Sequence, residues 1–404
     1  MIFIIAWRNI WRNYGRSFVV IGSIIVGMWS LVFLSGFMNG FMAGFINNAV
    51  RHEFSNIQIH HPEFKEDYEI KYFIEDGNIV ADKVAYLPGI KSVTTRSITN
   101  GMISSAKKAT GVQILGINPS NEAAVTQIDL LLSEGKYFEG VKRNPVLIGE
   151  KLANNLNAKV RSKLVLTFQD INGNITAGAF RVVGILKSSS VKINEATAYV
   201  QQSDLNKLLE IGDEIHEIAV TTHSDIEQTS IKSQIIANNP TLLTEDWKEL
   251  APILNFMTVW FDMMLRVLIV IVMMALAFGI VNTMLMSVLE RFKELGILMA
   301  VGMNKAKVFM MILAETLMLA LVGGPLGMLA GYLTMSYLGV DGIDLTDYSE
   351  ALSAIGYESI LYPKIASYIY FEIAVGVMIT SFLGALYPAW KAVTLKPVDA
   401  IAKI

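Results

Sequence analysis

The chain has 404 residues, of which 53% are hydrophobic and only 17% are charged, whereas soluble proteins carry about 25% charged residues. A net charge of −3 provides no basic surface that would favour nucleic acid, and the absence of cysteine excludes disulfides, thiolate metal sites and cysteine nucleophiles. The charge deficit falls in four apolar blocks. The sequence therefore predicts an α-helical membrane protein with four transmembrane helices and a mixed α/β extracytoplasmic domain inserted between helices 1 and 2.

Residues 1–16 are predicted to form a cytoplasmic amphipathic helix on the inner surface of the lipid bilayer. Trp7 and Trp11 suit the headgroup region. Arg8, Arg12 and Arg16 recur every four residues, on a stripe that can meet anionic lipid heads. A plain signal that stops translocation and orients the chain explains these residues equally well.

Residues 17–46 are predicted to form transmembrane helix 1. Positions 17–45 carry no charge, and a helix of that length spans roughly 43 Å against about 30 Å of hydrocarbon, so it should tilt or project from the membrane. A cleaved signal peptide is disfavoured, because its apolar region would be only about 7–15 residues long and would end at a small-residue cleavage site.

Two sets of glycines with four-residue spacing predict close helix packing. They lie in the first and third apolar blocks: Gly36, Gly40, Gly44 and Gly323, Gly327, Gly331. Such spacing leaves a bare groove along one helix face, which lets another backbone approach. The groove is either a static packing surface or a seam that opens during transport.

An apolar substrate cavity is predicted at the outer halves of the first two helices. Its candidate lining is Phe37, Met38, Phe41, Phe45 and Met264, because Phe and Met adapt to varied apolar ligands. Ordinary contact with lipid is the alternative interpretation.

Residues 47–261 are predicted to form the extracytoplasmic domain, which is large enough for a core of its own. Strands are predicted at 56–60, 112–117, 146–148, 164–169, 180–185, 196–200 and 218–222, with a hairpin turn at Asn172 and Gly173, and helices at 149–157, 202–210 and 226–238. The sequence has no His-Glu-x-x-His pattern and no Gly-x-Ser-x-Gly elbow. The domain is therefore predicted to be a binding or coupling module without a metal or a catalytic site.

Residues 262–404 are predicted to contain the other three transmembrane helices, at about 263–289, 308–338 and 371–390, joined by a cytoplasmic coupling loop at 290–307. This loop carries Arg291, Lys293, Lys305 and Lys307, and short cytoplasmic segments are enriched in Lys and Arg. Both termini and the 290–307 loop are therefore predicted to be cytoplasmic, and segments 46–262 and 339–370 to lie outside.

Glu315 is an ionisable residue inside the third apolar block, about 10–12 Å along the helix from Lys307. A charge at that depth is a functional candidate. It is predicted either to pair with a basic residue of the inner face or to cap a contact within the bundle. Proton coupling is the alternative.

Two segments carry a family resemblance. Residues 290–303 (ERFKELGILMAVGM) are similar to the pattern ERxxEIGxLRAxG, although Met299 stands where that pattern often has Arg. Residues 386–392 (LYPAWKA), followed by residues 396–401 (KPVDAI), are similar to the ending YPAxxAxxxxPxxAL. With one helix before a large outside domain and three after it, the chain resembles the permeases of the MacB/FtsX/Lol superfamily of ABC transporters.

The resemblance implies a permease subunit of a mechanotransmission ABC transporter in the bacterial inner membrane, not an enzyme. The chain has no Gly-x4-Gly-Lys-Ser/Thr sequence, so ATP and Mg²⁺ would be bound by a separate cytoplasmic ATPase dimer, and this chain would hold no cofactor. A second permease subunit, identical or related, is implied as well. The residues implied to couple to the ATPase are Glu290, Arg291, Lys293, Glu294, Leu298 and Gly302.

Three features are similar to the lipoprotein-releasing LolC/LolE branch: residues 38–41 (MNGF), the absence of an ATPase domain and residues 245–247 (EDW). This branch implies extraction of lipoproteins from the outer leaflet of the inner membrane and their transfer to a periplasmic carrier. A MacB-like efflux or secretion permease, acting with an adaptor and an outer-membrane channel, is the first alternative. An FtsX-like regulator of cell-wall hydrolases is the second.

Overall fold

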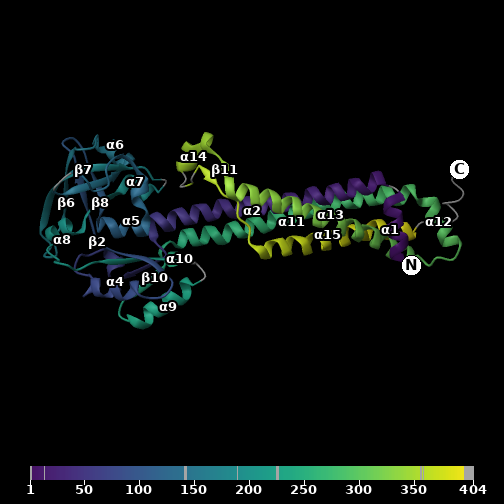
Figure 1. The fold of residues 1–404 in the computed structure, drawn as a ribbon, viewed down its shortest axis with the longest axis horizontal. Helices are drawn as coiled ribbons and strands as arrows, with labels where there is room; N and C mark the ends of the chain where they lie inside the picture. The colour runs from purple at the N-terminus through teal and green to yellow at the C-terminus, as the bar shows by residue number, and fades with distance from the viewer. Residues whose placement is uncertain are drawn as a thin grey trace. The chain divides into compact units, whose positions relative to one another are not determined.

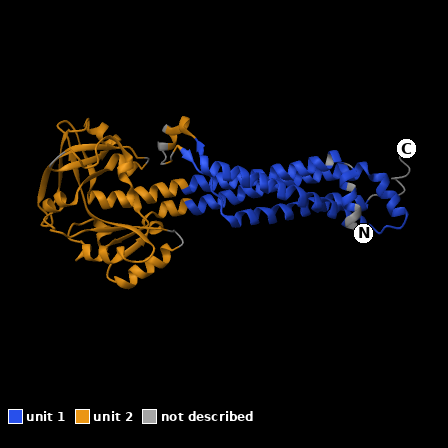
Figure 2. Ribbon diagram, in the orientation of Figure 1, with its two compact units in different colours: residues 1–43, 258–344, 360–404 blue, residues 44–257, 345–359 orange. Residues whose placement is uncertain are grey.

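The structure is a computed structural model that describes residues 2–12, 14–140, 143–188, 190–223, 227–354, 357 and 359–394. The side chain of Arg16 and the 396–401 motif lie outside the described part. The chain forms two compact units (Figure 2): unit 1 comprises residues 1–43, 258–344 and 360–404, and unit 2 comprises residues 44–257 and 345–359.

Unit 1 is built from long apolar helices (Figure 1). Its elements are α1 (Ile2–Arg12), most of α2 (Tyr14–Ala49) and of α11 (Pro252–Glu290), α12 (Phe292–Ala300), α13 (Lys305–Asp341), α15 (Ser367–Thr394) and the short strands β11 (Ile343–Asp344) and β12 (Ile360–Leu361). Four of the helices, α2, α11, α13 and α15, are long and apolar enough to cross a membrane. This confirms the four predicted transmembrane helices.

Helix α13 is the most enclosed of these four helices. Within its most apolar stretch 61% of the residues are buried, against 17% for α11. It packs against α1 and α15, and its Ile312, Leu319 and Met335 lie in the apolar core of unit 1. Helix α11 is left with a large exposed apolar face.

The segment predicted as the coupling loop contains the helix α12. After α12 the chain reverses at Gly302, whose φ of +105° favours glycine. Asn304 then caps α13, because its side chain accepts a hydrogen bond from the backbone N–H of Ala306. These local signals hold α12 between the ends of α11 and α13.

Unit 2 is a mixed α/β domain around one sheet of ten strands, with the order β10-β1-β9-β2-β3-β8-β5-β7-β4 and with β6 pairing β2 and β7. The strands are β1 (Ile57–His60), β2 (Ile90–Ser104), β3 (Ala109–Ile117), β4 (Leu132–Gly135), β5 (Pro145–Gly149), β6 (Lys163–Gln169), β7 (Ile175–Leu186), β8 (Thr197–Gln201), β9 (Glu217–Thr222) and β10 (Leu243–Asp246). The α-helices are α3 (Phe64–Asp67), α4 (Gly77–Ala85), α5 (Pro119–Thr126), α6 (Glu150–Leu156), α7 (Val191–Ala196), α8 (Gln202–Leu209), α9 (Gln228–Asn238), α10 (Trp247–Leu250) and α14 (Ser349–Ala354). The described part of unit 2 also contains three helical turns of other types: η1 (Val50–Phe54), a π-helix, and the 3₁₀-helices η2 (Ile128–Leu131) and η3 (Thr346–Tyr348).

All seven predicted strands are present, and the predicted hairpin turn joins β6 to β7. In that turn Asp170 Oδ1 accepts hydrogen bonds from the backbone N–H groups of Asn172 and Asn174, both at 2.9 Å, and Gly173 has φ +81°. The prediction missed β2, the longest strand of the sheet. It was missed because the buried face of β2 carries polar groups, among them Thr94 and Arg96.

Arg96 is the centre of a buried charge cluster between β1, β2, β9 and α5. Its guanidinium donates to Glu122 Oε1 at 2.6 Å and to Glu217 Oε1 at 2.5 Å, and His60 Nε2 lies 3.0 Å from Glu217 Oε2. All four side chains are at most 7% exposed. Burial disfavours the charged form of Glu217, but the positive charge of Arg96 and the hydrogen bond from His60 outweigh it and lower the pKa of Glu217 to about 2.

His216 is a second buried histidine beside this cluster. Its Nδ1 accepts a hydrogen bond from the backbone N–H of Ile98, and its Nε2 lies 3.0 Å from the carbonyl oxygen of Ile70. The neutral ring, protonated at Nε2, satisfies both contacts. Burial lowers the pKa of His216 to about 4.

We expect unit 2 to lose stability in acid in two stages. The unfolded chain binds a proton at His216 near pH 6.5 and the folded chain near pH 4, so this stabilisation is complete above about pH 6.5 and is lost as the pH falls towards 4. The contribution of Glu217 is complete above about pH 4.5 and is lost towards pH 2. The measurement is the melting temperature of the β-sheet circular dichroism signal, taken on the full chain in detergent. His216→Gln should flatten the upper stage alone, and an unchanged profile in that variant would contradict the assignment.

Candidate functional site

Arg291 and Glu315 form a buried ion pair at one end of unit 1. Arg291 follows the last residue of α11, and Glu315 lies on α13. Arg291 Nη1 lies 3.1 Å from Glu315 Oε1 and 3.2 Å from Oε2, and the two side chains are 9% and 8% exposed. Apolar residues, including Val288, Leu295 and Met311, surround the pair. Glu315 thus has the basic partner that was predicted for it.

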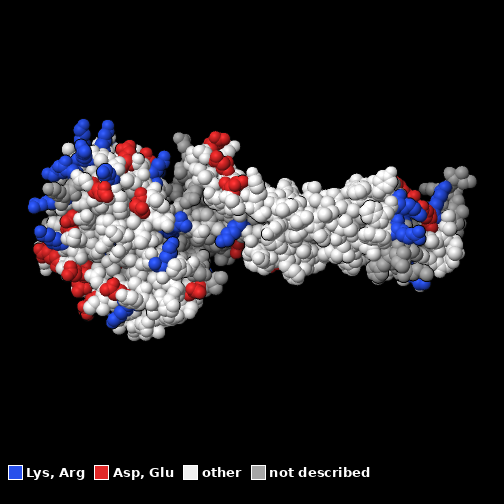
Figure 3. All heavy atoms as spheres, in the orientation of Figure 1, with Lys and Arg blue, Asp and Glu red and all other residues white. Residues whose placement is uncertain are grey.

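Two further charges extend this pair to α1. Arg291 Nε lies 3.4 Å from Glu294 Oε2, and Arg12 donates to the same carboxylate oxygen. The Arg12 and Glu294 side chains are 55% and 50% exposed. Figure 3 shows charged side chains gathered at this end of unit 1, while the middle of the bundle carries none on the face shown. A relay of four charges therefore connects α1, α12 and α13.

The residues predicted to couple to the ATPase separate into an inner and an outer set. Arg291 is buried, whereas Leu298 packs against the core of unit 1 and is partly buried. Lys293, Glu294 and Glu290 are exposed, and Gly302 forms the turn after α12. Direct contact with an ATPase therefore stays a prediction for the residues that are not buried, while the buried Arg291 would act from inside the bundle.

Two exposed apolar residues near the C-terminal end of α12 were not predicted. Ile297 and Val301 are 55% and 84% exposed. With Lys293 they are spaced four residues apart, which places the three on one helical face. This four-residue spacing is the sequence feature from which an exposed apolar face could have been predicted.

The glycines of α13 lie against α2, as their spacing predicts. A Cβ added at Gly323 would lie 3.1 Å from the Ile21 carbonyl oxygen, and one added at Gly327 would lie 2.7 Å from the Ile25 carbonyl oxygen. A Cβ added at Gly331 would lie 2.8 Å from Val32 Cβ. The helices could not approach this closely with larger residues at these positions.

The glycines of α2 behave differently from one another. A Cβ at Gly36 would meet the side chain of Met335, and one at Gly40 would meet the backbone of Tyr362 and Pro363. At Gly44 no described atom lies within 4 Å of an added Cβ. Packing at Gly44 therefore stays a prediction, since no described residue of this chain uses the space it leaves.

Aromatic rings of α2 form a ladder that ends on α11. Trp29, Phe33, Phe37 and Phe41 stack in sequence with ring centroids 5.6–6.4 Å apart, and Phe41 stacks on Phe261 of α11 at 6.4 Å. The Phe37 and Phe41 rings are only half-buried within this chain. The ladder offers an apolar surface that a hydrocarbon chain can lie against.

The remaining predicted cavity residues take no part in the ring stacking of this ladder. Met38 and Met264 are half-buried. Phe45 belongs to unit 2, where its ring stacks on Tyr357 at 4.8 Å. A substrate cavity at these residues stays a prediction.

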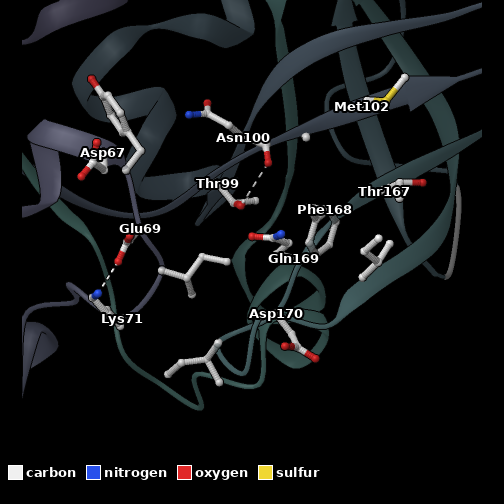
Figure 4. Close-up of a pocket in the computed structure, with 16 residues that line it drawn as sticks. Asp67, Glu69, Lys71, Thr99, Asn100, Met102, Thr167, Phe168, Gln169 and Asp170 are labelled. Atoms are coloured by element: carbon white, nitrogen blue, oxygen red, sulfur yellow. Dashed lines mark hydrogen bonds and ion pairs between the residues drawn. The ribbon is translucent and has the colours of Figure 1, made fainter.

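A larger cavity opens in unit 2, beside a gap in the sheet (Figure 4). β9 pairs with β2 as far as Arg96, and β6 pairs with it from Met102. The cavity, of about 670 Å³, lies beside this gap and is lined by the 67–71 segment, β2, β6 and the β6–β7 turn. Its walls mix the Glu69–Lys71 ion pair with apolar side chains such as Met102 and Phe168. Such a cavity suits a peptide or a protein segment better than a purely apolar ligand.

Two family models match this chain. The FtsX-like permease C-terminal model matches residues 266–397, and the MacB-like periplasmic core domain model matches residues 17–238. The second match covers more than half of the chain. Together they include all of α13 and α15 and parts of α2 and α11, as well as most of unit 2.

Several curated proteins are similar to the chain. An uncharacterized ABC transporter permease of Methanocaldococcus jannaschii is 27% identical over 67% of this chain and 65% of its own length. The lipoprotein-releasing system transmembrane protein LolC of Neisseria meningitidis is 22% identical over 78% of each chain. The macrolide export ATP-binding/permease protein MacB of Chromobacterium violaceum is 33% identical over 35% of this chain and 20% of its own length. The chain thus spans less than two thirds of the first and the last of these relatives.

Among solved structures, the periplasmic region of MacB from Actinobacillus actinomycetemcomitans is 13% identical to the chain. The superposition covers 52% of this chain and 97% of the MacB chain, with a TM-score of 0.37.

Proposed function

The chain belongs to the ABC transporter permeases that join a MacB-like periplasmic core domain to an FtsX-like C-terminal region, and from this we propose that it is the membrane subunit of an ATP-driven mechanotransmission transporter. It would sit in the bacterial inner membrane with unit 2 in the periplasm and both termini in the cytoplasm, as the distribution of Lys and Arg favours. ATP and Mg²⁺ would be bound by a separate ATPase dimer.

The observation that carries this proposal is the relay behind α12. An ATPase that docks on the exposed face of Lys293, Ile297 and Val301 would move α12. Because Arg291 is paired with Glu315 inside the bundle, movement of α12 would be transmitted to α13. The exposed apolar face of α11 leaves room for a second permease subunit, identical or related.

Lipoproteins extracted from the outer leaflet are the proposed substrate, and a periplasmic carrier would receive them. The half-buried aromatic ladder from α2 to α11 supports this substrate, since burial of each acyl methylene contributes about 0.8 kcal/mol. The similarity to a LolC protein over 78% of both chains supports it as well.

A MacB-like exporter, acting with an adaptor and an outer-membrane channel, is the second candidate. The mixed-polarity cavity of Figure 4 favours it, because such a surface suits a peptide or a protein segment. An FtsX-like regulator of cell-wall hydrolases is a third possibility, which rests on the C-terminal family match alone.

Photocrosslinking in native membranes tests these proposals. A probe at Phe41 is expected to capture a lipoprotein, and ATP should abolish the adduct only when the partner ATPase is active. The control is a probe at Phe371 on α15, whose side chain is 73% exposed in the chain and should capture lipid. Adducts of the Phe41 probe to an adaptor or to a hydrolase, without a lipoprotein, would overturn lipoprotein extraction and leave only the shared transport architecture.

A further inference from the structure

A small cavity in unit 2 has the lining of an oxyanion site. Its volume is about 330 Å³, and it lies among the last turn of α2, the π-helix η1, the end of β9 and the start of α10. Three basic residues line it, Arg51, Lys91 and Lys248, and none of its described lining residues is acidic. The cavity is therefore positively charged on its described sides.

No described acidic residue compensates the three positive charges. None of them forms an ion pair with another described residue. Lys248 Nζ lies over the ring of Trp247, 5.7 Å from its centroid. Like charges around one cavity repel one another, and an anion placed between them would convert that repulsion into attraction.

Asn56, in the lining of the cavity, has an amide donor without a partner among the described residues. The Asn56 carbonyl oxygen accepts hydrogen bonds from Gln228 Nε2 at 2.7 Å and from the Trp247 backbone N–H at 3.1 Å, and Asn56 Oδ1 accepts one from the Thr222 backbone N–H at 3.2 Å. These bonds hold the Asn56 amide in place, while its Nδ2 donates to no described residue. An amide N–H donor that is held in place and has no partner among the described residues is available to a bound acceptor.

We propose that this cavity binds a phosphate-class oxyanion, supplied either by a lipid headgroup or by free phosphate. Arg51 offers the planar fork of donors that pairs with two oxygens of one phosphate, and the two lysines add point charges. Asn56 supplies a neutral donor through its Nδ2. The volume lies at the lower end of the range for ligand cavities, about 300–1,000 Å³, which suits a compact anion.

The bound anion would act on the connection between α2 and the rest of unit 2. Arg51 lies on η1, which begins directly after α2, and Lys248 lies on α10, which ends two residues before the first residue of α11. An anion held by both residues fastens these two connections to one point. The binding itself requires neither the ATPase nor a transported substrate, so its test stands apart from the proposed transport function.

The test is a fluorescence titration of the full chain in a phosphate-free detergent. Trp247 is the only tryptophan of unit 2 and lines the cavity, so it reports on occupancy. The two probes are inorganic phosphate and monomeric dihexanoyl phosphatidylglycerol, both titrated at constant ionic strength. We expect a saturable change, and a dissociation constant about a hundredfold or more weaker in the R51Q/K91Q/K248Q variant, since loss of one charge-assisted contact weakens binding by about tenfold.

A variant with the same change of net charge shows whether anion binding depends on this cavity or only on the overall charge of the chain. K83Q/K107Q/K108Q removes the same charge from exposed positions of unit 2 and should bind both probes as the unaltered chain does. Phosphatidylglycerol binding more than tenfold tighter than phosphate would assign a lipid headgroup, and equal binding would assign free phosphate. The proposal is overturned if neither probe gives a saturable change, or if the two triple variants lose affinity equally. Equal melting temperatures for the two variants exclude misfolding as the cause.

Discussion

The Arg291→Leu variant is expected to destabilise unit 1 by about 3–5 kcal/mol, because loss of one partner from a buried ion pair leaves the other charge unpaired. The stranded group is the Glu315 carboxylate, 3.1 Å from Arg291 Nη1 and 8% exposed. Glu315→Leu should cost a similar amount by stranding the guanidinium. The double variant R291L/E315L removes both charges and should recover most of the loss. Thermal denaturation of the purified chain in detergent measures all three.

The exposed end of the relay provides the control. Arg12 and Glu294 also form an ion pair, but their side chains are 55% and 50% exposed, so Arg12→Leu should change stability by about 1 kcal/mol or less. Equal losses from Arg12→Leu and Arg291→Leu would show that burial of the inner pair does not govern its contribution.

The double variant R291L/E315L also distinguishes a role of the ion pair in stability from a role in transmitting movement from α12 to α13. If the pair links α12 to α13, R291L/E315L will fold and will still bind its ATPase, but substrate will no longer stimulate ATP hydrolysis. Normal stimulation in this variant would restrict the pair to a structural role. The result therefore shows whether the ion pair transmits movement or only stabilises the bundle.

The second large effect is expected at the contact between α13 and α2. A methyl group at Gly327 would lie 2.7 Å from the Ile25 carbonyl oxygen and 3.0 Å from the Ile25 Cα atom. Backbone atoms cannot rotate away as a side chain can, so Gly327→Ala should push the helices apart and cost about 1–3 kcal/mol. The melting temperature of the chain in detergent measures this loss.

Gly279→Ala on α11 is the matched substitution. No described atom lies within 4 Å of a Cβ at Gly279, and alanine favours a helix over glycine by about 1 kcal/mol. This variant should be neutral or slightly more stable. If Gly327→Ala is equally harmless, the glycine groove does not bring the two helices into contact. If Gly327→Ala is destabilising and also abolishes transport at a temperature where the chain is folded, the contact opens during the cycle.

Hydropathy alone was sufficient to predict the four long helices, because each carries a run of apolar residues longer than the hydrocarbon core requires. The pairing of Glu315 with Arg291 could be anticipated only in part. Both residues were singled out, but Arg291 was assigned to the ATPase contact. Its inward orientation depends on Glu315, which lies 24 residues further along the chain, and local sequence patterns do not show that the two side chains meet.

In unit 2 the strands with continuous apolar faces were predictable, and β2 was not. Residues such as Thr94 and Arg96 are typical of a surface, yet they are buried in this strand. They are stable there because Glu122 and Glu217, distant in the sequence, supply the partners. A polar core of this kind is recognised only when the topology is known.

The unequal apolar character of the helices has a consequence for the biogenesis of the protein. Helix α11 has a mean hydropathy of 2.7 in its most apolar window, whereas α13 has 1.9 and contains Glu315, Pro325 and three of the packing glycines. A segment with a carboxylate and several small residues enters lipid less readily by itself than one rich in Leu, Ile and Val. The two surfaces that compensate for these defects, the groove-filling side of α2 and the guanidinium of Arg291, both precede α13 in the chain. The order of synthesis therefore places the stabilising partners in the bilayer before the helix that needs them.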